Sequence, residues 1–105
     1  MSLAVVWSQR AEEQLDEHVE GVRERRGVGA ARALVVRVFE RLDAVGQLPE
    51  SAPRWRAVVD PAFRRLVVDD YVVIYRVAPE DRVIQVLSFR HGRQRPVSVD
   101  DVAEP

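Results

Sequence analysis

The chain has 105 residues, enough for one domain with a single hydrophobic core and too few for two. It is 47% hydrophobic and 31% charged, with a formal net charge of −1, so we expect a globular domain that is not a bulk nucleic-acid binder. The absence of cysteine excludes disulfides and thiolate chemistry, and two histidines far apart in the sequence, His18 and His91, do not predict a metal centre, so no cofactor is expected. With no apolar run of about 18 residues and no visible signal peptide, we expect a cytoplasmic protein without a membrane partner.

The first third of the sequence predicts a strand followed by two helices. Residues 3–7 form a short apolar, β-branched run typical of a buried strand, and Ser8 is a good N-cap for the helix that follows. Apolar side chains then recur every three or four residues up to Gly27 and Gly29, which we expect to end the first helix. A second apolar stripe predicts a helix from Ala30 to Val45. Two helices with so short a link should form an antiparallel hairpin.

The second half of the sequence predicts three strands. Residues 47–61 contain three prolines and show no period, as is typical of a connector. Segments rich in Val, Ile, Tyr and Phe follow at residues 63–68, 71–77 and 83–89, with turns between them. The predicted order is β-α-α-β-β-β, an α+β fold in which the helical hairpin packs on an antiparallel sheet. Residues 1–96 are the expected domain, and residues 97–105, with Asp100, Asp101 and Glu104, an acidic flexible tail.

These elements carry residues that together resemble the RelE/ParE toxin superfamily of type II toxin–antitoxin systems. The resemblance runs over roughly residues 4 to 96 and rests on four segments in order: Trp7-Ser8-x-x-Ala11-x-x-Gln14-Leu15, Leu48-Pro49, the pair of runs at residues 63–68 and 71–77, and Arg90-His91-Gly92-Arg93-Gln94-Arg95-Pro96. The sequence departs from the family pattern in the helical hairpin, where His18 replaces an aliphatic residue and Gly21 an aromatic one. Such a toxin is implied to have the β-α-α-β-β-β fold.

The resemblance implies two alternative activities, because the superfamily includes RelE-like ribonucleases that cut mRNA on the ribosome and ParE-like toxins that poison DNA gyrase. RNA cleavage needs a base, an acid and cations at the phosphorane. Here Val72 stands where the ribonuclease group has an arginine, no lysine is present, and no tyrosine follows Tyr75. We therefore expect a ParE-like toxin without an enzymatic step of its own, with the mRNA endoribonuclease as the alternative and an inactive binding module as the second alternative.

Several residues are candidates for the site under these alternatives. If the chain is a ribonuclease, His91 is the expected acid or base, assisted by Arg64 and Arg93; otherwise His91 closes its strand and turn. Arg90, Arg93 and Arg95 are the candidate target-binding residues, and the alternative is a solvated charge cluster. His18, on an apolar helical face, is expected at the edge of the core. Trp7 and Trp55 are expected in the core or in an interface.

The resemblance also implies protein partners. A toxin requires a cognate antitoxin, which would wrap an extended segment around an exposed strand edge and an apolar groove beside the hairpin. We expect a heterodimer or a larger toxin–antitoxin assembly. The expected target is DNA gyrase, and the alternative target is the ribosome with its mRNA.

Overall fold

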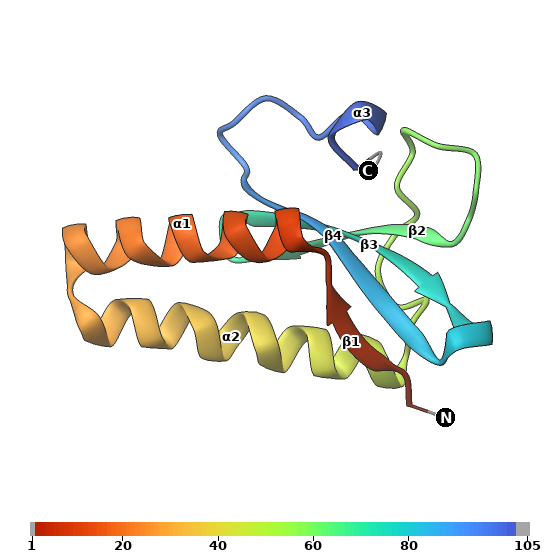
Figure 1. The fold of residues 1–105 in the computed structure, drawn as a ribbon, viewed down its shortest axis with the longest axis horizontal. Helices are drawn as coiled ribbons and strands as arrows, with labels where there is room; N and C mark the ends of the chain where they lie inside the picture. Colours follow the sequence, from red (N-terminus) through yellow and green to blue (C-terminus); the bar gives the residue numbers. More distant parts are fainter. Residues whose placement is uncertain (1, 103–105) are drawn as a thin grey trace.

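The computed structural model describes residues 2–102, and Glu104 of the expected acidic tail lies outside this range. The chain order is β-α-α-β-β-β followed by one short helix, as Figure 1 shows, so the predicted α+β fold is confirmed. The elements are β1 (Ala4–Trp7), α1 (Gln9–Arg26), α2 (Val28–Gln47), β2 (Phe63–Val68), β3 (Tyr71–Ala78), a 3-10 turn (Pro79–Asp81), β4 (Val83–His91) and α3 (Val99–Val102).

The two long helices run antiparallel, side by side, as the short link between them predicts (Figure 1). Ser8 caps α1, since its Oγ accepts a hydrogen bond of 3.1 Å from the Ala11 N–H. Gly27 alone joins the helices, at φ +95°, a conformation that a residue with a side chain rarely adopts. As a consequence α2 begins at Val28, two residues before the expected start, and Gly29 lies inside its first turn.

The four strands lie in the order β1-β4-β3-β2. The pairs β2–β3 and β3–β4 are antiparallel, but β1 pairs with β4 in parallel, from Ala4↔Val83 to Trp7↔Val86. The sheet is therefore mixed, and the expectation of an antiparallel sheet holds for the meander only. The helical hairpin explains the difference, because it returns the chain to the start of β1, where the Leu3 N–H donates to the Gly46 carbonyl at 2.7 Å. The connector then carries the chain to the far edge, and the meander leads back to β1.

The hydrophobic core lies between the helices and the facing side of the sheet. Its completely buried members include Val38 on α2, Tyr75 on β3 and Phe89 on β4. The Tyr75 hydroxyl donates to the Pro49 carbonyl at 2.8 Å, so it also anchors the connector. Trp55 of the connector is buried against Phe63, with ring centroids 6.2 Å apart, whereas Trp7 is half-buried between Phe39 and Phe89.

Beyond Val86, β4 extends past the end of β1 and has no strand on that side among the described residues. The Gln14 side chain of α1 takes the place of a strand there, since its Oε1 accepts a 2.9 Å hydrogen bond from the Phe89 N–H. Helix α1 thus bonds the backbone of β4 where β1 has ended, and this contact holds the last part of β4 in place. Within residues 2–102, none of the helices combines the length and the apolar character needed to cross a membrane.

Candidate functional site

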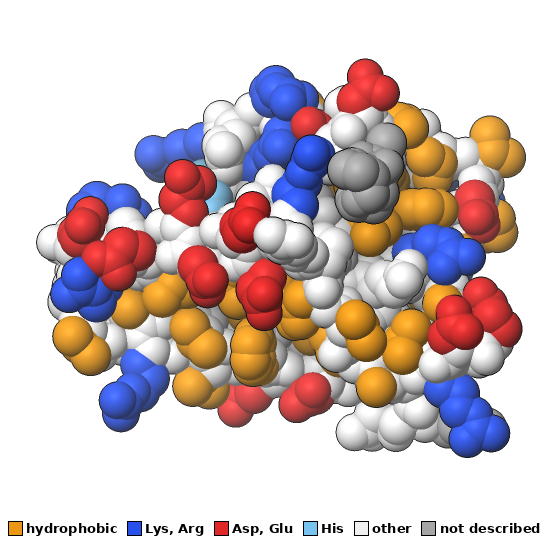
Figure 2. Space-filling model, in the orientation of Figure 1, with side chains coloured by type: hydrophobic (Ala, Val, Ile, Leu, Met, Phe, Trp, Pro, Cys, Tyr) orange, Lys and Arg blue, Asp and Glu red, His pale blue; other side chains and the backbone are white. Residues whose placement is uncertain are grey.

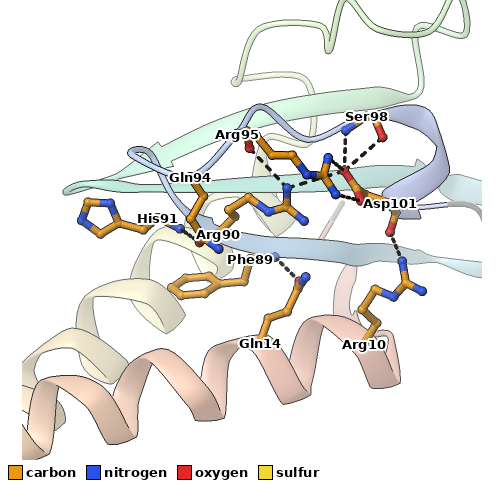
Figure 3. A network of polar contacts seen from close by, with 9 residues as sticks. All are labelled: Arg10, Gln14, Phe89, Arg90, His91, Gln94, Arg95, Ser98 and Asp101. Carbon is orange, nitrogen blue, oxygen red and sulfur yellow. Dashed lines mark hydrogen bonds and ion pairs between the residues drawn. The ribbon is translucent and has the colours of Figure 1, made fainter.

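The arginines at and after the end of β4 do not act as one exposed cluster, because two of them converge on a carboxylate of the same chain. Arg95 binds Asp101 with both terminal nitrogens, at 2.9 and 3.0 Å. Arg90 lies 3.5 Å from the same carboxylate and also donates to the Arg95 carbonyl at 3.2 Å (Figure 3). The Arg90 and Asp101 side chains are only 11% and 12% exposed, which makes this a largely desolvated pair, whereas Arg95 is 66% exposed.

Asp101 reaches the arginines because the local sequence folds it back. The Asp101 Oδ2 accepts hydrogen bonds from the Ser98 N–H at 2.7 Å and from the Ser98 hydroxyl at 3.1 Å, an arrangement of the capping-box type at the start of α3. Arg10 of α1 donates to the Asp101 carbonyl at 2.6 Å. Bonding to Arg95, and then to Ser98, holds the pKa of Asp101 well below its usual range, so this carboxylate is ionised throughout the physiological pH range.

His91 is fixed as part of the turn that follows β4. The Nδ1 atom of its ring accepts a 3.0 Å hydrogen bond from the backbone N–H of Arg93. The backbone N–H of His91 donates to the Gln94 Oε1 at 2.9 Å. Because Nδ1 is used as an acceptor, Nε2 is the ring nitrogen that can donate a hydrogen bond. The ring packs edge-on against Tyr71, with centroids 5.2 Å apart.

The His18 ring also packs against Tyr71, although His18 and His91 are far apart in the sequence. Its ring meets Tyr71 and Phe89 edge-on, at centroid distances of 5.3 and 5.7 Å. Burial lowers the pKa of His18, which favours the neutral ring at the edge of the core. Within residues 2–102 no three His, Cys, Asp or Glu side chains gather as a metal ion requires.

Arg64 lies away from His91. It pairs with Tyr75 in the sheet, while His91 pairs with Tyr71, so the two are separated by about 13 Å along β3 at the usual strand rise. The Arg64 guanidinium donates to the Ala52 carbonyl at 3.0 Å and to the Pro61 carbonyl at 3.2 Å, and so it holds the connector. Of the three residues named for a ribonuclease, the structure brings together only His91 and Arg93.

The exposed cationic group at this end of the sheet is instead formed by Arg93 and Arg65. Both line a shallow cavity of about 270 Å³ together with His91, Asp69 and Asp70, over a floor of Val67 and Val72. A second cavity of about 130 Å³ continues from Arg65 across the same sheet face to Trp55. Its lining also includes Ile74, Arg90, Gln94 and Arg95. Arg65 was not among the residues expected at the site, although strand alternation places it on the opposite face from the buried Leu66 and so could have indicated it.

Comparison with known proteins agrees with this fold. The sequence profile of the family described as "ParE toxin of type II toxin-antitoxin system, parDE" matches residues 5–96. A solved structure of the chromosomal ParDE toxin–antitoxin system from P. aeruginosa is similar, with a TM-score of 0.68 and 20% identity over 86% of this chain and 96% of the other. A free E. coli RelE toxin carrying two arginine-to-alanine substitutions has a TM-score of 0.62 and 20% identity over 89% of this chain and 86% of the other. No curated sequence matches this chain significantly.

Proposed function

Because the chain belongs to the ParE toxin family of type II toxin–antitoxin systems, we propose that it arrests growth in the cytoplasm by binding DNA gyrase and that a cognate antitoxin neutralises it. The observation that supports gyrase over mRNA is that Val72 stands where the ribonuclease group has an arginine, while no lysine and no tyrosine after Tyr75 supplies a further acid or base. The position of Arg64 adds to this. General acid–base cleavage of RNA needs the base, the acid and the cations within hydrogen-bond reach of one phosphate. Arg64 is bonded to connector carbonyls about 13 Å along β3 from His91.

The surface proposed to meet the target centres on Arg65 and Arg93. The original candidates were Arg90, Arg93 and Arg95, but the first and last are bonded to Asp101 in this structure. Arg65 and Arg93 are exposed beside a shallow cavity with an apolar floor. The rim also holds Asp69 and Asp70, so charges of both signs surround an apolar centre, and a polar rim around an apolar centre is typical of a protein-binding surface.

The surface proposed for the antitoxin lies at the β1 edge of the sheet, whereas Arg65 of the target surface lies on β2 at the other edge. The strands β1 and β2 are the two edges of the sheet, so each offers backbone groups to an added strand. Beside β1, hydrophobic side chains gather over α2 (Figure 2). The exposed hydrophobic residues of β1 and α2, which we call the apolar strip, are Val6, Val28, Val36 and Phe39. An antitoxin segment that pairs with β1 would cover this apolar strip at the same time.

Growth and gyrase assays test the proposal together. Induction of the chain should stop growth with an SOS response, and coexpression of the antitoxin encoded beside it should restore growth and yield a copurifying complex. The purified chain should inhibit DNA supercoiling by gyrase. Rapid loss of translation with mRNA cleavage would instead establish the ribonuclease alternative, and absence of growth arrest would establish an inactive binding module.

The double variant Arg65→Ala/Arg93→Ala tests the target surface. A hydrogen bond to a charged group contributes about 1.5–3 kcal/mol, so loss of two should raise the concentration for half-inhibition of gyrase by tenfold or more. Arg41→Ala, an exposed arginine on α2, is the matched control and should leave inhibition unchanged. Equal inhibition by the double variant and the control would show that this surface does not contact gyrase.

A further inference from the structure

The carboxylate of Asp101 is bound as a ligand would be bound. Arg95 holds both of its oxygens, Arg90 approaches one of them from β4, and the Ser98 N–H and hydroxyl donate to the same oxygen (Figure 3). Bidentate contact with arginine is the geometry that recognises planar carboxylates. Arg90 and Arg95 thus form a carboxylate-binding pair on the end of the sheet.

The segment that supplies this carboxylate is otherwise loosely attached. Helix α3 is a single turn of four residues, too short to be stable alone. Its apolar side chains Val99 and Val102 face β2 and β4 across a cavity of about 340 Å³, which Phe63 and Leu87 also line. Since the apolar side is not closely packed, the contacts of Asp101 and of its carbonyl with Arg10 hold the segment in place.

We propose that the Arg90–Arg95 pair is a binding site for an acidic segment of a partner protein, and that residues 98–102 occupy it as an internal substitute. The partner segment would present a carboxylate flanked by aliphatic residues, the pattern of Val99-Asp100-Asp101-Val102, with its aliphatic side chains filling the space beside Phe63 and Leu87. A carboxylate is favoured over a phosphate because the bound group is a planar carboxylate and because the neighbouring cavity is apolar. The inference rests on the proposed function only for the expectation that the chain has a protein partner.

The internal segment must then compete with any external one. A tethered segment acts at an effective concentration on the order of millimolar. An external peptide should therefore bind about tenfold or more weakly when residues 98–102 occupy the site than when the site is free. Opening the site without touching the arginines should therefore increase the affinity for an external peptide.

Peptide binding to the purified full-length chain tests this. The probe is a capped peptide with the sequence Pro-Val-Ser-Val-Asp-Asp-Val, which copies residues 96–102, and the control peptide has asparagine in the position of Asp101. The Asp101→Asn chain should bind the probe at least tenfold more tightly than the unmodified chain does. Asp100→Asn, at the exposed neighbouring residue, is the matched control and should behave like the unmodified chain. Adding Arg95→Ala to Asp101→Asn should abolish binding.

Three results would overturn the proposal: a folded Asp101→Asn chain that binds the probe no better than the unmodified chain does, equal binding of the two peptides, or equal binding of a short single-stranded oligonucleotide. The last would mark a general polyanion surface. Ser98→Ala removes only the hydroxyl contact to Asp101 and is expected to increase affinity by a smaller factor, so it replaces Asp101→Asn if that variant fails to fold. Because none of these measurements involves gyrase or growth, their failure would leave the proposed function standing.

Discussion

Gly46 provides the sharpest test of how the first strand is held. It lies in the last turn of α2, is buried, and accepts the Leu3 N–H at 2.7 Å. A Cβ at Gly46 would stand 2.5 Å from the Leu3 carbonyl oxygen, about an ångström closer than ordinary contact. Because that neighbour is backbone, the clash can be relieved only by moving β1 away from α2.

The expected change in the free energy of unfolding is the sum of one stabilising and two destabilising contributions. In a helix interior alanine is better than glycine by about 1 kcal/mol. Forcing an extra methyl group into a packed site costs about 1–3 kcal/mol, and loss of the Leu3–Gly46 hydrogen bond costs about 1 kcal/mol more. We therefore expect Gly46→Ala to lower the free energy of unfolding by about 1–3 kcal/mol.

Urea unfolding measures this change, and Gly21→Ala is the matched control. A Cβ at Gly21 meets only the terminal atoms of the Arg25 side chain, at 3.0 Å, and these can move away. Gly21→Ala should therefore stabilise the chain by up to about 1 kcal/mol through helix propensity. If Gly46→Ala were as stable as Gly21→Ala, the close approach of β1 to α2 would not be a constraint and the reasoning would be refuted.

Two further substitutions test the edge of β4 and the histidine on α1. Gln14→Leu leaves the Phe89 N–H without its acceptor and should lower the free energy of unfolding by about 1–3 kcal/mol. Gln9→Leu, at the exposed start of the same helix, is the control and should change the free energy of unfolding by less than about 0.5 kcal/mol. Equal urea midpoints for the two variants would contradict the role of Gln14. Because the pKa of His18 is lowered in the folded state, the unfolded chain takes up its proton first, and the stability that the neutral ring contributes is lost as pH falls below about 6.5. His18→Leu should therefore gain stability relative to the unmodified chain between pH 7.5 and pH 5, and a difference that is the same at both pH values would refute the assignment.

The local elements could be predicted because they depend on residues close in sequence. The Ser8 cap and the three β-branched runs gave boundaries within two residues of those observed. The parallel direction of β1 could not be predicted from its four residues, since it depends on the route of the chain through the helices and the connector. The start of α2 was placed too late because Gly27 alone makes the link and Gly29 tolerates the helix.

The candidate site was harder to predict, because its contacts join residues from different elements. Asp101 appeared in the sequence as one charge of an acidic tail, although the spacing Ser98-x-x-Asp101 carried a capping-box signal. The separation of Arg64 from His91 depends on strand register, which the alternation of side chains does not fix. The meeting of His18 and His91 on Tyr71 is likewise a property of the tertiary structure.

The parallel pairing of β1 with β4 has a consequence for the order of synthesis. The first strand has its strand partner at residues 83–86, which are synthesised after both long helices and the other two strands. The helical hairpin closes through local contacts, but this pairing closes the loop between residues 7 and 83 and is expected to form late. During translation β1 therefore has no strand partner until β4 has been made, and the edge of the sheet proposed to bind the antitoxin is complete only then. An antitoxin already present in the cell would meet its partner at that moment.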